Sequence, residues 1–229
     1  TGTILLVPEL ISHEMERRFC IAAGDTASRY AEVLSFTRLA RRVADSVGSA
    51  AAECLDKGGR VVAMAAAARQ LASRLKAYAA VETKPEFLTG LIDAVDEFKR
   101  CCITSADLMA AAEATEGSLA QKLEELALLM ECYDALCAQG SRDPRDLETL
   151  LLEQLEEGTF AEDHVFYIDG FPDFTRQHLA ILEYLIRRSP EVTVSLNCDS
   201  VDSHLLAFEK AGQTARQILN CAERAGVPV

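Results

Sequence analysis

Several signatures are missing from this 229-residue sequence, and each missing signature argues against a class of protein. No apolar run approaches the roughly 20 residues that a helix needs to cross a bilayer, so we expect no membrane partner. The eight cysteines form no CxxC pair and show no Cys/His spacing typical of zinc sites. A zinc domain and a secreted, disulfide-stapled domain are therefore disfavoured, and we expect buried, reduced thiols in a cytoplasmic protein.

The common catalytic signatures are missing as well. His13-Glu14 is not followed by a second histidine four residues after His13, which excludes the zinc-protease helix pattern. No Ser/His/Asp or Cys/His arrangement can be recognised. The glycine-rich loop G-x-x-x-x-G-K-[ST], which cradles nucleotide phosphates, is absent. We therefore assign no catalytic residue and no confident metal ligand, and we expect that these residues alone do not hydrolyse ATP.

Positive charge is scarce. The net charge of −13 argues against a protein that simply coats nucleic acid. The acidic excess lies mainly in residues 50–160, whose exposed faces we expect to meet protein or solvent. Residues 1–49 are balanced and contain a local cluster of arginines at Arg38, Arg41 and Arg42.

The hydrophobic pattern divides the chain into three zones. Residues 1–49 alternate strand and helix, residues 50–160 are helical throughout, and residues 161–229 return to strand and helix. The pattern predicts strands at residues 4–7, 32–36, 164–168 and 192–196. It predicts helices at residues 11–22, 37–47, 63–80, 119–136, 175–188 and 207–225, and two more that begin at Pro85 and Pro144.

Strands separated by helices imply right-handed crossovers and a parallel sheet. We therefore expect an α/β fold with a large all-helical insertion between its second and third strands. Residues 1–8 (TGTILLVP) have no basic leader and are predicted to enter a strand at once. From this abrupt start we expect the chain to be a piece of a longer polypeptide.

Three helix caps can be placed from the sequence. Thr104 and Asp107 resemble a capping box, with aspartate in place of the usual glutamate or glutamine. Asp143 is predicted to cap the helix that begins at Pro144, and Thr175 the helix that ends near Arg188.

Residues 165–175 (VFYIDGFPDFT) contain the first candidate site. A buried-strand pattern leads directly into Asp169, and a capped helix follows. In nucleotide-hydrolysing α/β proteins, a carboxylate at the carboxyl end of a parallel strand can reach a magnesium–phosphate complex. Gly170 stands where a water-activating glutamate would normally follow. The alternative interpretation is a loop aspartate that solvates the turn, with Asp173 simply beginning the next helix.

Residues 35–42 (SFTRLARR) contain the second candidate site, where a strand ends and a helix begins. Free amides, hydroxyls, an aromatic ring and arginines at such a junction can hold a single-stranded backbone and stack a base. The alternative is a capped, solvated helix whose Phe36 lies in the core.

Three blocks, in this order, resemble the superfamily 1 helicases of the UvrD/RecB type. Residues 4–17 are similar to the strand and helix that follow that family's phosphate loop. Residues 35–40 (SFTRLA) are similar to its DNA-contacting TFHxLA motif, and residues 168–173 (IDGFPD) to the VDEFQD form of its Walker B motif. The sequence departs from the family at Gly170 and Pro172, where a glutamate and a glutamine belong. It departs again at residues 197–200 (NCDS), where the family has GDxxQSIY.

These motifs and departures together resemble the AddB (RexB) family, the second subunits of bacterial AddAB helicase–nucleases, which process double-strand breaks for recombination. Blocks typical of that family are VPE, VLSFTRLA, EFKR, LAQKL and IDGF, at residues 7–9, 33–40, 97–100, 119–123 and 168–171. The resemblance spans nearly the whole chain. It implies a partial RecA-like parallel sheet of the P-loop NTPase type that lacks its phosphate loop, with the helical zone as a 1B-like subdomain.

The resemblance also implies a function. The parent protein would be an ATP-dependent deoxyribonuclease subunit with exonuclease activity, and an AddA-like helicase–nuclease partner would supply translocation. Mg²⁺, ATP and a 4Fe–4S cluster would serve the parent outside these residues, and none of the eight cysteines is assigned to the cluster.

We expect the chain itself to be a non-motor, helicase-like domain that guides single-stranded DNA or a broken duplex end. Its DNA contacts would be Ser35, Phe36, Thr37, Arg38 and Arg41, with Asp169 and Asp173 as remnants of the Walker B site. The alternative is a pure protein-interaction scaffold, derived from a helicase, that binds neither DNA nor nucleotide.

Overall fold

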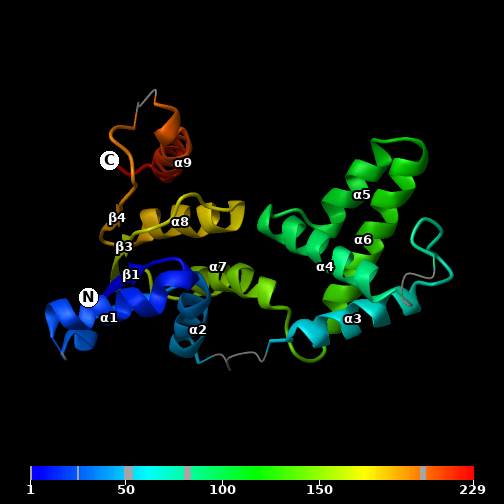
Figure 1. Cartoon of the computed structure of the whole chain (residues 1–229), viewed down its shortest axis with the longest axis horizontal. Coiled ribbons are helices and arrows are strands. Elements are labelled where there is room, and N and C mark those ends of the chain that lie inside the picture. The colour runs from blue at the N-terminus through cyan, green and yellow to red at the C-terminus, as the bar shows by residue number, and fades with distance from the viewer. Residues whose placement is uncertain (1, 25, 49–53, 80–83, 202–204) are drawn as a thin grey trace. The chain divides into compact units, whose positions relative to one another are not determined.

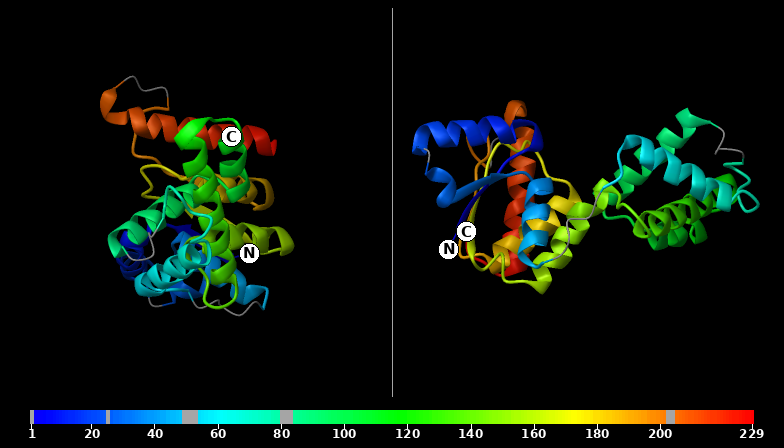
Figure 2. Two further views of the ribbon diagram at one scale, coloured as in Figure 1. Left: turned by 90° about the vertical axis from the view of Figure 1, so that its right-hand side faces the viewer. Right: turned by 90° about the horizontal axis from the view of Figure 1, so that it is seen from below.

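The structure is a computed structural model that describes residues 2–24, 26–48, 54–79, 84–201 and 205–229. The chain forms two compact units (Figures 1 and 2). The α/β unit comprises residues 1–51 and 147–229, and the helical unit comprises residues 52–146. The helical unit is thus inserted in the α/β unit, which resumes at Leu147 rather than at residue 161, the boundary expected from the sequence.

The α/β unit is built on a four-stranded, fully parallel sheet with the order β2-β1-β3-β4. Its strands are β1 (Gly2–Leu6), β2 (Ala31–Leu34), β3 (His164–Ile168) and β4 (Val192–Val194). The register aligns Leu6 with both Leu34 and Ile168, so the strands end level with one another. The predicted fold class is confirmed: this is a partial RecA-like sheet with a large helical insertion.

The described residues of this unit form the helices α1 (Ser12–Ala23), α2 (Phe36–Ser46), α7 (Leu147–Glu157), α8 (Arg176–Arg188) and α9 (Glu209–Ala225). Short 3₁₀ turns precede α1, β2 and α9: η1 (Glu9–Ile11), η2 (Ala27–Arg29) and η5 (Leu206–Phe208). Helices α2, α7 and α8 bury one face of the sheet, where Ile4 and Phe166 are fully enclosed. Helix α1 packs against β2 on the other side, as the right-hand view of Figure 2 shows.

The helical unit contains α3 (Lys57–Gln70), α4 (Pro85–Arg100), α5 (Ser105–Glu113), α6 (Gly117–Ala138) and the 3₁₀ turn η4 (Pro144–Asp146), drawn in cyan to green in Figure 1. Its separate core is centred on Met64 and Tyr133, neither of which is exposed. Pro85 begins α4 as predicted, and Thr104 and Asp107 form the predicted capping box.

Two predicted helices differ from the structure by more than two residues at an end. Helix α3 begins at Lys57 rather than at residue 63, because Asp56 caps it by accepting the Gly59 N–H at 2.7 Å, and it ends at Gln70 rather than at residue 80. The helix predicted to begin at Pro144 begins instead at Leu147, after η4. That helix, α7, packs on α2 in the α/β unit.

Arg60 centres a buried charge network in the helical unit. Its guanidinium binds the Asp96 carboxylate, donates to Asp143 at 3.2 Å and donates from Nε to the Tyr133 hydroxyl at 3.2 Å. Arg145 adds a second guanidinium to Asp96 at 3.0 Å. Asp143 was predicted only as a helix cap, but it is fully buried and also pairs with Arg60 and Lys99.

Lys99 extends the network. Its ammonium lies 2.8 Å from Asp134, 3.4 Å from Asp143 and 2.5 Å from Asp146. Burial alone would raise the pKa of Asp143, but the charge of Lys99, the backbone N–H of Arg145 and the charge of Arg60 together hold that pKa below its ordinary value. Burial raises the pKa of Asp146 despite Lys99. Helices α3, α4 and α6 are therefore joined to η4 through paired charges.

The two ends of the helical unit lie side by side. Cys54 forms a parallel bridge with Arg142, and the Leu55 N–H donates to the Arg142 carbonyl at 2.8 Å. The chain therefore enters and leaves this unit at neighbouring points.

Glu125 of α6 organises the turn that follows α3. Its carboxylate accepts the backbone N–H groups of Lys76, Ala77 and Tyr78 at 2.9–3.0 Å, and the Gln121 amide at 3.0 Å. Burial alone would raise the pKa of Glu125, but these donors hold it below its ordinary value. The side chain thus stands where a bound anion would sit and fixes the turn.

We expect Glu125→Gln to lower the free energy of unfolding by about 1–3 kcal/mol, because charge-assisted hydrogen bonds are lost and an amide N–H₂ meets backbone donors. Urea unfolding followed by circular dichroism measures the change. The neighbouring Glu124 is exposed, so Glu124→Gln is the matched control and should be nearly neutral. Equal stability of the two variants would show that the carboxylate does not hold the turn.

The expectation of buried thiols is wrong for most of the cysteines. Cys137 and Cys221 are buried, Cys102 is exposed and the other five are half-buried. Of the six that are not buried, only Cys20 and Cys132 lie on helices; the others lie in turns and loops. None of the described helices is long and apolar enough to cross a membrane.

Candidate functional site

The carboxyl ends of the strands bring four polar side chains to one edge of the sheet. Glu9 follows β1, Ser35 follows β2, Asp169 follows β3 and Ser195 follows β4. Backbone hydrogen bonds continue one residue past the strands, since the Asp169 N–H donates to the Leu6 carbonyl at 3.0 Å. In parallel α/β sheets this edge is where ligands bind.

Ser35 links the first two strands to α2. It is the N-cap of α2, accepts the Arg38 N–H at 3.3 Å, and donates its hydroxyl to the Glu9 carboxylate. The residue is buried. The Ser35 hydroxyl therefore already donates one hydrogen bond and accepts another. The Glu9 carboxylate lies beside the N-terminus of α2, a position that would otherwise favour a phosphate.

Phe36 lies in the core, which corrects its predicted role as a platform for a base. Its ring is 4% exposed and stacks on the His178 imidazole, with centroids 4.1 Å apart and planes 6° from parallel. Phe171 packs edge-on at 5.6 Å, and Phe174 continues the cluster from Phe171 at 5.0 Å. The alternative interpretation of this motif, a core phenylalanine, describes the structure.

The basic residues of α2 differ in their availability. Arg38 pairs with Glu16 of α1 at 3.2 Å, and Arg42 pairs with Glu32 of β2 at 3.1 Å. Arg41 is exposed and makes no ion pair with any residue that the structure describes. Thr37 is half-buried at the first turn of α2. Of the predicted contacts, Arg41 is thus the most accessible to a ligand.

The two aspartates of the degenerate Walker B motif make separate contacts. Asp169 is half-buried and accepts the hydroxyl of Ser195, which follows β4. Asp173 is exposed and pairs with Lys210 of α9 at 2.5 Å. Asp173 does not begin α8, because Thr175 caps that helix by accepting the His178 N–H at 3.1 Å.

Gly170 adopts a backbone conformation that favours glycine. Its φ is +79°, in the left-handed region, and a Cβ placed on it would lie 3.0 Å from Ile11 Cδ1 and 3.5 Å from Pro8 Cδ. A glutamate here would be strained and would press on η1. The loop after β3 is therefore shaped for the glycine that replaces the expected catalytic residue.

The residues present do not form a magnesium–nucleotide site by themselves. Asp169 has a serine hydroxyl as its neighbour, and no group of three His, Cys, Asp or Glu among the described residues is placed to hold a metal ion. Mg²⁺ is commonly held by one or two carboxylates together with substrate phosphates, which need a phosphate-binding loop nearby. That loop is absent from the sequence.

Sequence reasoning missed Glu9, Ser195 and His178. Glu9 and Ser195 each follow the end of a strand, and that position in the sequence could have identified them as candidate site residues. His178 carries no local signal: its role arises because α8 places it on Phe36, with Nε2 at 3.3 Å from Glu148. Its Nδ1 is buried without a hydrogen-bond partner among the described residues.

The chain is similar to known proteins over most of its length. A relative in Caldanaerobacter subterraneus subsp. tengcongensis is 31% identical over 99% of this chain and 20% of its own length. One in Moorella thermoacetica is 32% identical over 99% of this chain and 21% of its own length. One in Thermoanaerobacter sp. is 33% identical over 86% of this chain and 17% of its own length.

All three relatives are named as the B subunit of an ATP-dependent helicase/deoxyribonuclease. The chain spans about a fifth of the length of these curated relatives. The family model described as "ADDB, N-terminal" matches residues 1–229. This chain therefore belongs to the AddB N-terminal family.

Proposed function

We propose that this chain is the N-terminal, non-motor region of the B subunit of an ATP-dependent helicase/deoxyribonuclease. In this role it guides DNA and docks the partner subunit while double-strand breaks are processed for recombinational repair. The names of the relatives support the subunit assignment. The observation that carries the non-motor role is Gly170, whose left-handed backbone and contact with Ile11 disfavour the catalytic glutamate.

The rest of the activity lies outside these residues in this proposal. Mg²⁺, ATP, the 4Fe–4S cluster and the nuclease centre belong to other parts of the parent protein, and an AddA-like helicase–nuclease subunit supplies translocation. The complex works in the bacterial cytoplasm, where its DNA substrate is. The helical unit corresponds to a 1B-like subdomain. Robust DNA-stimulated ATP hydrolysis by the intact subunit would contradict the non-motor role.

The DNA contacts are phosphate contacts centred on the first turns of α2. Arg41 is available at once, and Arg38 becomes available when its pair with Glu16 opens. That pair is partly exposed, with 31% and 46% of the two side chains accessible, and such pairs contribute only about 0–1 kcal/mol. Binding should therefore weaken steeply with salt.

Single-strand binding tests this assignment. We expect Arg41→Ala and Arg38→Ala each to weaken binding of a labelled oligonucleotide roughly two- to tenfold at about 50 mM salt, and to lower the salt slope by about 0.7. Fluorescence anisotropy provides the measurement. Arg187 is exposed on α8, and Arg187→Ala is the matched control.

Glu9→Gln should have the opposite effect and strengthen binding, because it removes a negative charge beside the N-terminus of α2 and keeps an acceptor for Ser35. Unchanged affinity in Arg38→Ala, Arg41→Ala and Glu9→Gln would show that α2 does not contact DNA.

A second candidate is a scaffold that only docks the partner subunit. The burial of Phe36 and the pairing of Ser35 with Glu9 favour it, because both residues are withdrawn from solvent. The scaffold would bind no DNA even at low ionic strength, yet would form a stable complex with the partner. Size-exclusion chromatography with the partner, together with the anisotropy titration, separates the two functions.

A further inference from the structure

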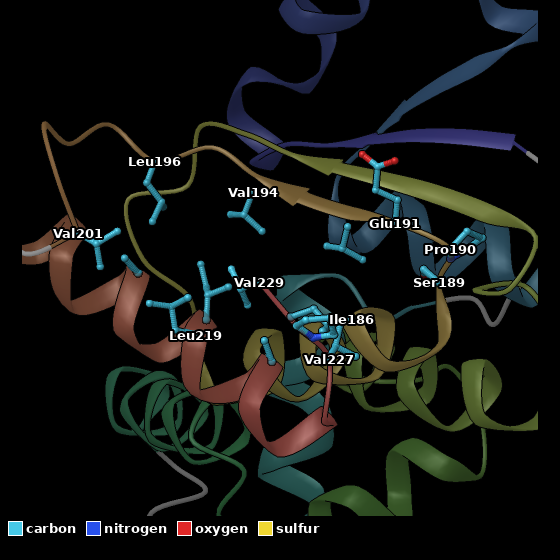
Figure 3. A pocket seen from close by; sticks show the side chains of 15 residues that line it. Ile186, Ser189, Pro190, Glu191, Val194, Leu196, Val201, Leu219, Val227 and Val229 are labelled. Carbon is cyan, nitrogen blue, oxygen red and sulfur yellow. The ribbon is translucent and has the colours of Figure 1, made fainter.

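Positive charge is distributed unevenly over the molecule. The apolar groove of about 290 Å³ between β4 and α9 (Figure 3) has a single charged residue, Glu191, in its described lining, so it does not suit an anionic ligand. The turn that follows α3 in the helical unit is different. Residues 61–81 contain Arg69, Arg74 and Lys76 but no aspartate or glutamate, although this unit is acidic overall. The turn is thus an exception to the acidic faces expected of the helical zone.

An aromatic pair joins this turn to the first turn of α4. The rings of Tyr78 and Phe87 lie with their centroids 5.9 Å apart, and Phe87 is 44% exposed. Lys76 lies two residues before Tyr78. Lys84 is the N-cap of α4, and its carbonyl accepts the Phe87 N–H at 3.0 Å. Lysines therefore flank the aromatic pair, and we call Arg74, Lys76, Tyr78, Lys84 and Phe87 the aromatic–basic surface.

The three cations of this surface are available to a ligand. Arg74, Lys76 and Lys84 are all exposed, and none of them forms an ion pair with a residue that the structure describes. Glu86, between Lys84 and Phe87, is exposed in the first turn of α4, where the helix dipole favours a carboxylate. With three cations and one exposed carboxylate, the surface has a net positive charge.

The backbone beneath these side chains is already ordered. The Glu125 carboxylate accepts the N–H groups of Lys76, Ala77 and Tyr78 at 2.9–3.0 Å. Glu125 is only 3% exposed, so these donors and the Gln121 amide satisfy its charge from within the protein. A ligand would therefore meet side chains whose backbone is fixed beforehand, which reduces the entropy lost on binding.

We propose that the aromatic–basic surface binds a single-stranded segment of DNA, with the three cations on its phosphates and the exposed Phe87 ring against a base. Cations that follow a backbone, together with an accessible aromatic ring, are the combination that holds single strands without sequence preference. The bases of an intact duplex are stacked on one another, so the exposed ring favours a single strand. The proposal deepens the proposed function and rests on it in one respect, namely that DNA is the ligand of this chain.

Anisotropy titration of the full-length subunit with a labelled oligothymidylate tests the cations. We expect Lys76→Ala combined with Lys84→Ala to weaken binding about tenfold at about 50 mM salt and to make the salt dependence shallower by about 1.4, since each lost phosphate contact contributes about 0.7. Lys57 is exposed in the first turn of α3, roughly 20 Å away along that helix. Lys57→Ala is the matched control and should bind like the wild type. An unchanged salt dependence in the double variant would overturn the proposal.

Substitutions of Phe87 separate stacking from charge. Phe87→Leu retains an apolar side chain without an aromatic ring, and it should weaken binding about five- to tenfold while leaving the salt dependence unchanged. Phe87→Tyr retains the ring and should bind like the wild type. Circular dichroism checks that both variants are folded. Equal affinity of Phe87→Leu and the wild type would overturn the contact between this ring and a base.

Photocrosslinking locates the contact without any substitution. A single strand that carries iododeoxyuridine should crosslink, in the full-length subunit, to peptides that contain Tyr78 or Phe87, which mass spectrometry identifies. Crosslinks confined to other peptides would overturn the proposal. A double variant of Lys76 and Lys84 that loses affinity only for a duplex of the same length would overturn it as well, because a duplex offers no open base.

Failure of this inference can be distinguished from failure of the proposed function. If Arg41→Ala weakens single-strand binding but the variants of Lys76, Lys84 and Phe87 do not, this inference is wrong and the proposed function stands. If the full-length subunit binds no DNA, either alone or with its partner subunit, the proposed role in guiding DNA is wrong as well.

Discussion

Asp143→Asn is expected to lower the unfolding free energy of the helical unit by about 3–5 kcal/mol, the range found when one partner of a buried ion pair is removed. Asp143 is fully buried and contacts both Arg60 and Lys99. The asparagine would leave those two largely buried cations short of one negative charge. Urea unfolding by circular dichroism measures the loss, which hydrogen exchange in α4 and α6 assigns to this unit.

Asp93 provides the matched control for this experiment. It lies on α4 in the same unit but is exposed, so Asp93→Asn should change stability by less than about 0.5 kcal/mol. Similar effects of the two substitutions would mean that the charge network does not hold the helical unit together.

The same network makes stability depend on pH. The pKa of Asp143 is lowered in the folded protein, so its contribution is complete above the unfolded pKa of about 3.9 and is lost as the pH falls toward the folded value. The pKa of Asp146 is raised, so that group opposes folding most strongly above its folded pKa and less as the pH falls through it. Stability should therefore decline below about pH 4 in the wild type and less steeply in Asp143→Asn.

Gly170→Ala is expected to lower the free energy of unfolding by about 2–4 kcal/mol, the sum of left-handed strain and crowding against Ile11. The φ of +79° and the 3.0 Å approach to Ile11 are the causes. Gly170→Glu should be at least as destabilising. It should also leave ATP hydrolysis by this chain at background, since the sequence contains no phosphate loop. Thermal unfolding and a phosphate-release assay provide the measurements.

Gly226 separates the two causes. Its φ is +70° and its ψ is +25°, in the left-handed region, but a Cβ there meets no atom within 4 Å. Gly226→Ala should therefore show only the strain, about 1–2 kcal/mol. If Gly226→Ala and Gly170→Ala are equally destabilising, the contact with Ile11 contributes nothing. A stable Gly170→Glu variant with DNA-stimulated ATP hydrolysis would contradict the proposed loss of motor function.

Local sequence signals located the elements that position the candidate site. Strand β3 has its predicted bounds because an apolar run ends at Asp169, and α8 begins at its predicted cap, Thr175. Strands β1 and β2 also lie where the pattern placed them, within one or two residues. These signals span a few neighbouring residues, so they can be found along the chain without knowledge of the fold.

Long-range contacts account for what the sequence did not reveal. The alanine-rich helix predicted to reach residue 80 stops at Gln70, and Glu125, far along the chain, holds the following turn. The residues next to Phe36 in the sequence resemble a DNA-binding motif, but in the fold the ring of Phe36 stacks on His178 of α8. Arg60 and Asp143 are 83 positions apart. No local sequence pattern predicts such pairs, because the two residues meet only after the helices have packed.

The adjacency of Leu55 and Arg142 has a consequence for the sheet. To the α/β unit, the whole helical unit is a loop between α2 and α7, which pack on each other. The free-energy cost of closing a loop grows only with the logarithm of the loop's length. Replacing the helical unit by a turn roughly a tenth as long would therefore change that cost by only about 2 kcal/mol. The helical unit can therefore lengthen, shorten or be exchanged while the strands that carry Asp169 and Ser35 keep their register.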